Sequence, residues 1–84
     1  MTQLSDQFGS IVRRSRESNG WSQEVLADRA GLNRSYLGEI ERGSAVPSLT
    51  TISKIATALE VSVSSLIALC EQPSFLNNVQ LANE

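Results

Sequence analysis

The chain has 84 residues, 40% of them hydrophobic, which suits one domain with a modest core and is too short for a two-lobed enzyme cleft. Because it has one cysteine and no histidine, an intrachain disulfide, zinc-finger ligation and histidine-based catalysis are excluded. The net charge of −2 does not favour nucleic acid, but six of the seven basic residues are arginines between Arg13 and Arg42, which leaves room for a local basic face.

Hydrophobic spacing predicts helices throughout the chain. The first helix is expected from about Ser5 to Ser18, because apolar residues recur at helical spacing and Asn19-Gly20 ends the pattern. The second begins after Ser22, a good N-cap residue, and stops at Gly31. Its inward residues are expected to be Val25, Leu26 and Ala30.

Three further helices follow. Asn33 caps the third, from Arg34 to about Arg42, and Gly43 stops it. Ser48 caps the fourth, whose expected inward residues are Leu49, Ile52, Ile55, Ala56 and Leu59. Ser62 caps the fifth, which runs to about Leu69 with Val63, Leu66 and Ile67 inward. No stretch alternates like a strand, so we predict an all-α five-helix bundle over residues 1–72 and a tail over 73–84 that forms a short helix or a dimer contact.

The second and third helices carry the most informative pattern. Ala27 is small where the two helices would cross, and Gly31 can adopt the positive φ that a sharp turn requires. Leu26, Ala30, Leu32, Leu37 and Ile40 would form their shared core, which leaves Arg34, Ser35, Gly38 and Glu39 outward. These features predict a helix-turn-helix from Gln23 to Arg42.

The same stretch resembles the phage repressor and Cro type of helix-turn-helix, the XRE-like family with a lambda-repressor-like fold. The resemblance rests on Trp-Ser-Gln-Glu-Val-Leu-Ala at 21–27, Ala-Gly-Leu at 30–32, Ile-Glu-Arg-Gly at 40–43 and Pro-Ser-Leu at 47–49, all in register. It continues through Ile55-Ala56, Leu59 and Val61-Ser62, and covers about Phe8 to Leu69. It implies a transcriptional regulator that binds double-stranded DNA through the start of its recognition helix.

The resemblance also assigns roles to residues. Base contacts are expected from Asn33, Arg34, Ser35 and Glu39, and phosphate contacts from Ser22, Gln23, Tyr36, Arg42 and Ser44. Arg34 is the main candidate for specificity, because a guanidinium can bond O6 and N7 of guanine together. Glu39 would accept from cytosine N4, repel wrong sites or orient Arg34, and Tyr36 is alternatively a core residue. Arg16 and Glu41 correspond to a structural ion pair in the family.

The remaining notable side chains have plainer interpretations. Trp21 is expected to pack as a hydrophobic staple against Val25 or Leu26, and Arg29 to be solvated. Cys70 is interpreted as a buried small hydrophobic residue rather than a redox group.

One recognition helix reads too few base pairs for genomic specificity, so a homodimer on a palindromic operator is expected. Its contact would use Val63, Leu66, Leu69, Phe75 and Leu76. The recognition helix further resembles those of restriction-modification controller proteins, with phage repressors and antitoxins as other subtypes. The alternative function is a protein-interaction module, such as an antitoxin-like partner, that does not touch DNA. We expect no enzymatic activity, metal, cofactor or small-molecule ligand, and, because no signal peptide or membrane span is apparent, a cytoplasmic protein.

Overall fold

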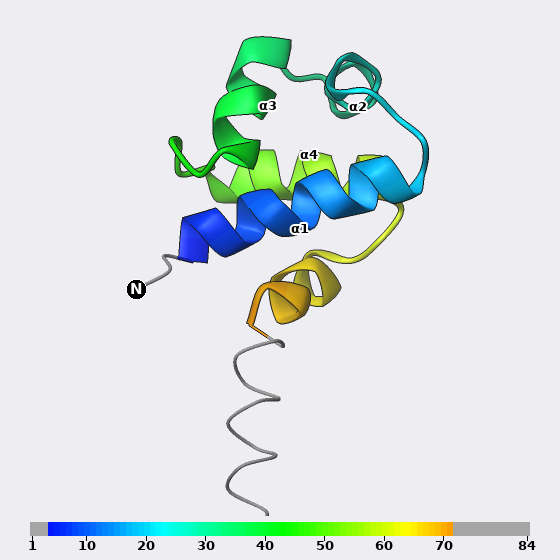
Figure 1. Cartoon of the computed structure of the whole chain (residues 1–84). Coiled ribbons are helices and arrows are strands. Elements are labelled where there is room, and N and C mark those ends of the chain that lie inside the picture. Colours follow the sequence, from blue (N-terminus) through cyan, green and yellow to red (C-terminus); the bar gives the residue numbers. More distant parts are fainter. Residues whose placement is uncertain (1–3, 72–84) are drawn as a thin grey trace, which may run out of the picture.

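The computed structural model describes residues 4–71 of the chain. Its helices are α1 (Leu4–Ser18), α2 (Gln23–Ala30), α3 (Arg34–Glu41) and α4 (Leu49–Leu59), followed by a fifth helix, Val63–Glu71 (Figure 1). These residues contain no strand, and the predicted all-α class with five helices is confirmed. The predicted tail at 73–84, including Phe75 and Leu76, lies outside the described residues.

The polar residues before α2, α3, α4 and the fifth helix act as N-caps, as the sequence predicted. The Ser22 hydroxyl accepts from the amide of Val25 at 3.2 Å, and the Asn33 carbonyl oxygen accepts from the amide of Ser35 at 2.8 Å. Ser48 caps α4 in the same way. Each cap satisfies an amide that the first turn of a helix leaves without a backbone partner, which fixes where these helices begin.

Helices α2 and α3 lie on one side of α1 and α4, and the fifth helix lies on the other (Figure 1). Helix α1 packs against α3 and α4, and α2 packs against the same two helices. The core between them contains Phe8, Ile11, Val12, Leu26, Ala27, Ala30, Leu37, Ile40, Ile52, Ile55, Ala56, Leu59, Leu66 and Cys70. This packing fixes the angle between the two helices of the predicted helix-turn-helix.

Helices α1 and α3 approach each other closely at Gly9, which is buried. A Cβ atom added there would run into the carbonyl oxygen of Ile40 and would lie 2.7 Å from that of Glu41. Both obstacles are backbone atoms of the last turn of α3, which cannot rotate away. Gly9 therefore sets how closely the end of α3 sits on α1.

Two sequence-based expectations about burial are wrong, and a third residue cannot have both of the roles expected of it. Leu49 is 79% exposed, because it is the first residue of α4 and stands at the edge of the bundle. Val25 is 38% exposed, since the short α2 turns Leu26 and Ala30 toward the core and leaves Val25 outward. Leu66 is fully buried, as its expected inward position requires, because Leu66 and Cys70 form the inward side of the fifth helix. It is therefore not available for the predicted dimer contact.

Trp21 and Arg29 form a contact that the sequence did not predict. Trp21 is partly buried and packs against the core. The guanidinium carbon of Arg29 lies 4.3 Å from the centre of its ring, within the range of a cation–π interaction. Arg29 is therefore exposed but stacks on Trp21, and its side chain shields part of that ring from water.

Cys70 is buried in the core as expected, and its thiol donates to the carbonyl of Leu66 at 3.3 Å. Burial raises the pKa of the Cys70 thiol, with a smaller contribution from the charge of Glu71. The thiol is therefore kept in its neutral, unreactive form.

Among residues 4–71, no single helix is long and apolar enough to cross a membrane. The pair formed by α4 and the fifth helix is long enough in combination, but it bends by 99° between its parts.

Candidate nucleic-acid interface

The turn between α2 and α3 is built around Gly31. This residue has left-handed backbone angles of φ 67° and ψ 37°, and its amide donates to carbonyls in the last turn of α2. The amide of Leu32 donates to Ala27 at 2.8 Å, which closes the turn. The Asn33 side chain then begins α3 immediately. The short turn therefore holds the start of α3 at a fixed position relative to α2.

A polar hollow of about 390 Å³ opens between the start of α2 and the outer face of α3. Its lining consists of Gln23, Arg34, Ser35, Gly38, Glu39 and Arg42. Five of these six were predicted to contact DNA, and the sixth, Gly38, was predicted to face outward. The structure thus brings into one surface side chains from the first residue of α2, from α3 and from the residue that ends α3.

Gly38 contributes to the hollow through its lack of a side chain. A Cβ atom at this position would lie 3.2 Å from Nη1 of Arg42 and 3.5 Å from Oε1 of Gln23. The two polar side chains therefore lie across the backbone of α3 at Gly38. Sequence reasoning placed Gly38 on the outer face but gave no hint that two neighbouring side chains use its space.

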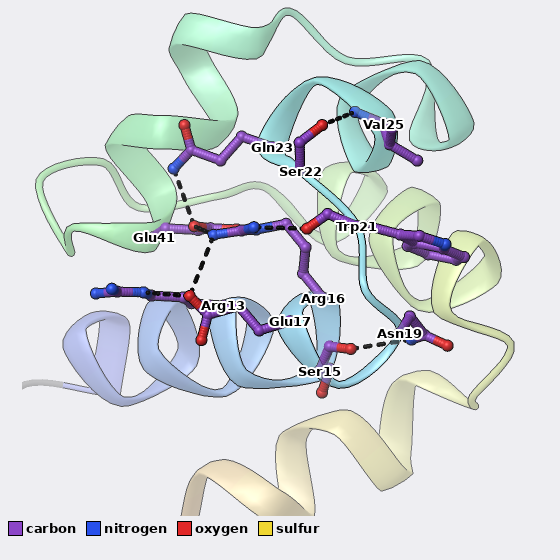
Figure 2. A network of polar contacts seen from close by, with 10 residues as sticks. All are labelled: Arg13, Ser15, Arg16, Glu17, Asn19, Trp21, Ser22, Gln23, Val25 and Glu41. Carbon is purple, nitrogen blue, oxygen red and sulfur yellow. Dashed lines mark hydrogen bonds and ion pairs between the residues drawn. The ribbon is translucent and has the colours of Figure 1, made fainter.

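A buried ion pair ties α1 to the end of α3 (Figure 2). Nε of Arg16 donates to Oε2 of Glu41 at 2.7 Å, and Nη2 donates to Oε1 at 3.0 Å. The two side chains are 10% and 2% exposed, and Nη1 of Arg16 also donates to the carbonyl of Trp21 at 2.8 Å. These bonds to Glu41 raise the pKa of the Arg16 guanidinium, so it stays charged. The structure has the Arg16–Glu41 pair that the family resemblance implied.

Gln23 joins this ion pair to the hollow. Its Nε2 donates to Oε1 of Glu41 at 3.0 Å, as the dashed line from Gln23 in Figure 2 shows. Gln23 is partly buried, at the first position of α2, and the carboxylate it contacts is at the last position of α3. The sequence suggested a phosphate contact for Gln23 but gave no sign of this second partner.

Three other predicted contact residues already make hydrogen bonds or packing contacts within the protein. Asn33 uses its carbonyl oxygen as the cap of α3, which leaves its amide N–H groups for other partners. Ser44 uses both its backbone N–H and its hydroxyl to donate to the carbonyl of Glu39, at 2.9 and 3.1 Å. Tyr36 is partly buried and packs against the core, as its alternative interpretation proposed. Of these three, Ser44 has to rearrange most before it can donate to a phosphate.

The arginines expected to form a basic face divide into separate groups. Arg34 and Arg42 line the hollow. Arg13 pairs with Glu17 at 3.2 Å, Arg16 is buried and Arg29 lies on Trp21. The positive charge on this surface therefore comes from two guanidinium groups, with the Glu39 carboxylate beside them.

The two short helices, their tight turn and the exposed polar face of α3 define a helix-turn-helix domain. The chain belongs to the helix-turn-helix family HTH_3, whose model matches residues 12–66. The resemblance noted from the sequence motifs is thereby confirmed. The relatives compared below are named as transcriptional regulators or controller proteins, a non-enzymatic class, as the sequence predicted.

The chain is similar to several regulators of known name. It is 35% identical over 68 residues to the HTH-type transcriptional regulator SutR of Escherichia coli, covering 81% of this chain and 38% of SutR. It is 39% identical over 59 residues to the immunity repressor of Bacillus phage phi105, covering 70% of this chain and 41% of the repressor. The chain thus spans about two-fifths of the length of these curated relatives.

Among solved structures, the restriction-modification controller protein C.AhdI from Aeromonas hydrophila is 45% identical in sequence. The superposition has a TM-score of 0.72 and covers 74% of this chain and 94% of C.AhdI. The likeness therefore extends over nearly the whole of that controller.

Proposed function

We propose that this protein regulates transcription in the cytoplasm by occupying palindromic operator DNA as a homodimer. The observation that carries the proposal is the polar hollow, because five residues predicted independently to contact DNA line it. Its two guanidinium groups provide positive charge for phosphates and donors for base edges. The net negative charge of the whole chain does not argue against DNA binding, because the electrostatic potential at the binding surface depends mainly on the charges nearby.

Within this interface, we assign the reading of bases to the first turns of α3. Arg34, Ser35 and Glu39 are exposed, so their side chains are free to enter the major groove. Asn33 stands beside them with its amide N–H groups available. Arg42 and Gln23 flank this face and would bind phosphates, together with Ser22 and the free amides at the start of α2. Ser44 and Tyr36 would make secondary contacts.

The proposed dimer contact involves the outer side of the fifth helix. Leu69 is 40% exposed and borders an apolar groove of about 310 Å³ that α1 lines with Ile11, Arg14, Ser15 and Ser18. Val63 is partly exposed on the same helix, whereas Leu66 is withdrawn from the proposal because it is buried. A single apolar patch suffices, since a two-fold interface is self-complementary.

Light scattering tests the oligomeric state. Leu69→Glu is expected to shift the protein from dimer to monomer, because burying a carboxylate in the dimer interface would carry a large desolvation cost. Ser64→Glu adds the same charge at an exposed position of the same helix and is the control. A wild-type protein that is monomeric at all concentrations, and also on DNA, would contradict the homodimer.

A finer proposal is that the protein is a restriction-modification controller. The match to nearly all of C.AhdI at 45% identity favours this subtype over the longer repressors. It is expected to bind two adjacent palindromic sites upstream of the genes it controls. Footprinting on the DNA upstream of the gene for this protein tests the subtype. A single isolated site there would argue for a repressor of another kind.

Selection of bound DNA from a random pool tests the proposed function directly. Wild-type protein is expected to enrich a palindrome, and Arg34→Ala to weaken its binding by about 1–3 kcal/mol and relax one position of each half-site. Arg34→Lys is the matched control: it keeps the charge but loses the bidentate geometry, so a base contact fails in both variants and a phosphate contact survives in the lysine variant. If the wild type enriches no sequence, the protein-interaction alternative replaces the proposal.

A further inference from the structure

Gln23 lies between a buried charge and the proposed DNA-binding surface. One of its amide N–H groups donates to Glu41 Oε1 at 3.0 Å, and the Glu41 side chain is only 2% exposed. Gln23 also lines the polar hollow. In Figure 2 the nitrogen of its amide faces Glu41 and the carbonyl oxygen points away from it. A single side chain therefore connects the interior ion pair to the surface that faces DNA.

The chemistry of Glu41 determines which way the Gln23 amide points. An ionised carboxylate only accepts hydrogen bonds, so the NH₂ group of Gln23 must face it and the carbonyl oxygen must turn away. The NH₂ group has two protons, one of which Glu41 binds. The second N–H remains available for an acceptor outside the protein, and a phosphate oxygen is such an acceptor.

Arg16 makes this arrangement compatible with DNA. It donates twice to the Glu41 carboxylate, at 2.7 and 3.0 Å, and supplies the opposite charge. Without that neutralisation, a carboxylate behind the interface would repel an approaching phosphate. The pair thus provides a fixed acceptor for Gln23 without a net negative charge.

We propose that Glu41, neutralised by Arg16, is a positioning residue for DNA binding that holds the Gln23 amide ready for a phosphate oxygen. This inference rests on the proposed DNA-binding function and adds to it. The ion pair, interpreted from the sequence as purely structural, then contributes to affinity through Gln23. A purely structural pair would instead affect the placement of all contact residues of α3 alike.

A double-mutant cycle separates these two roles. Arg16→Met with Glu41→Met replaces the buried pair by apolar side chains of similar length, a change that commonly leaves proteins folded. Gln23→Ala is measured by DNA affinity in the wild-type and in this double-methionine background. It is expected to weaken binding about tenfold in the wild type, the worth of one charge-assisted hydrogen bond, and no more than about twofold in the methionine background.

Arg34→Ala is the control in both backgrounds. It is expected to weaken binding by the same factor in each, which shows that α3 remains in place without the ion pair. If Gln23→Ala costs the same factor in both backgrounds, the positioning role is wrong while the DNA-binding function stands. If wild-type protein shows no specific DNA binding, the proposed function is overturned and this inference with it.

A second measurement on the unmodified protein avoids the need for a folded methionine variant. Nuclear magnetic resonance resolves the two side-chain amide protons of Gln23. One proton is expected to exchange slowly with water in the free protein, and the other to shift when DNA is added. Two rapidly exchanging protons in the free protein would refute the Glu41 bond and the proposal.

Discussion

Replacing Gly9 with alanine tests the close approach of α1 to α3. The added Cβ would lie 2.7 Å from the Glu41 carbonyl oxygen and closer still to that of Ile40. An ordinary C···O contact is about 3.3 Å or more, so the helices must separate by about 0.5–1 Å. A gap of that size removes a quarter to a half of the local dispersion attraction.

The magnitude follows from two opposing effects. Overpacking against atoms that cannot move costs about 3 kcal/mol, the upper part of its usual range. Alanine is a better helix former than glycine by about 1 kcal/mol, which offsets part of the cost. We therefore expect Gly9→Ala to lower the free energy of unfolding by about 2 kcal/mol, or the Tm by about 8–16 °C for a domain of this size.

Urea unfolding followed by circular dichroism measures the effect, with Ser10→Ala as the matched control. Ser10 is the next residue of α1 and is exposed, so its replacement gains helix propensity without any steric cost and is expected to be neutral or slightly stabilising. If Gly9→Ala stabilises the protein as the control does, the reasoning from the close contact is refuted.

Three other predictions concern charge and backbone. Gln23→Ala should weaken DNA binding without changing its salt dependence, because a neutral amide releases no counterion, whereas Arg42→Ala should lower the slope by about 1; equal slopes in salt titrations of the two variants would contradict this. Glu60→Gly should stabilise the fold by about 0.5–1 kcal/mol in urea unfolding, since Glu60 ends α4 at φ 62°, and a loss of stability would count against it. Burial raises the pKa of Cys70 above its ordinary value of 9.0, so the unfolded chain loses that proton first as pH rises. The free energy of unfolding should therefore fall above that pH, and fall less in Cys70→Ala; identical pH slopes would exclude the thiol as a cause.

The sequence predicts much of the fold because the residues that begin and end its helices act on neighbours only a few positions away. Ser22, Asn33 and Ser48 cap helices by bonding to amides two or three residues away, and Gly31 provides a turn that other residues rarely adopt. Such signals require no knowledge of distant partners. The Arg16–Glu41 pair spans 25 residues, and it was found only because a family resemblance linked its two ends.

What the sequence could not predict depends on contacts between elements. Gly9 in the middle of a helix indicates a weak helix position and says nothing about the carbonyl oxygens of α3 that face it. The Gln23–Glu41 bond joins residues 18 apart, with no motif to mark it. Leu49 and Leu66 both fit a helical stripe, and whether such a residue faces the core or solvent depends on where its helix sits in the bundle.

The recognition helix α3 is secured at both ends by contacts within the protein that do not involve DNA. The turn at Gly31 and the cap formed by Asn33's carbonyl oxygen fix its start, and Glu41 fixes its end on α1. Between them, Arg34, Ser35 and Glu39 point outward and are exposed. If these three residues read bases as we propose, DNA sequence preference can change through substitutions at exposed positions that leave the packing of α3 untouched. Because the proposed DNA-reading residues are separate from the residues that hold α3 in place, the domain is suitable for the design of variants with new operator sequences.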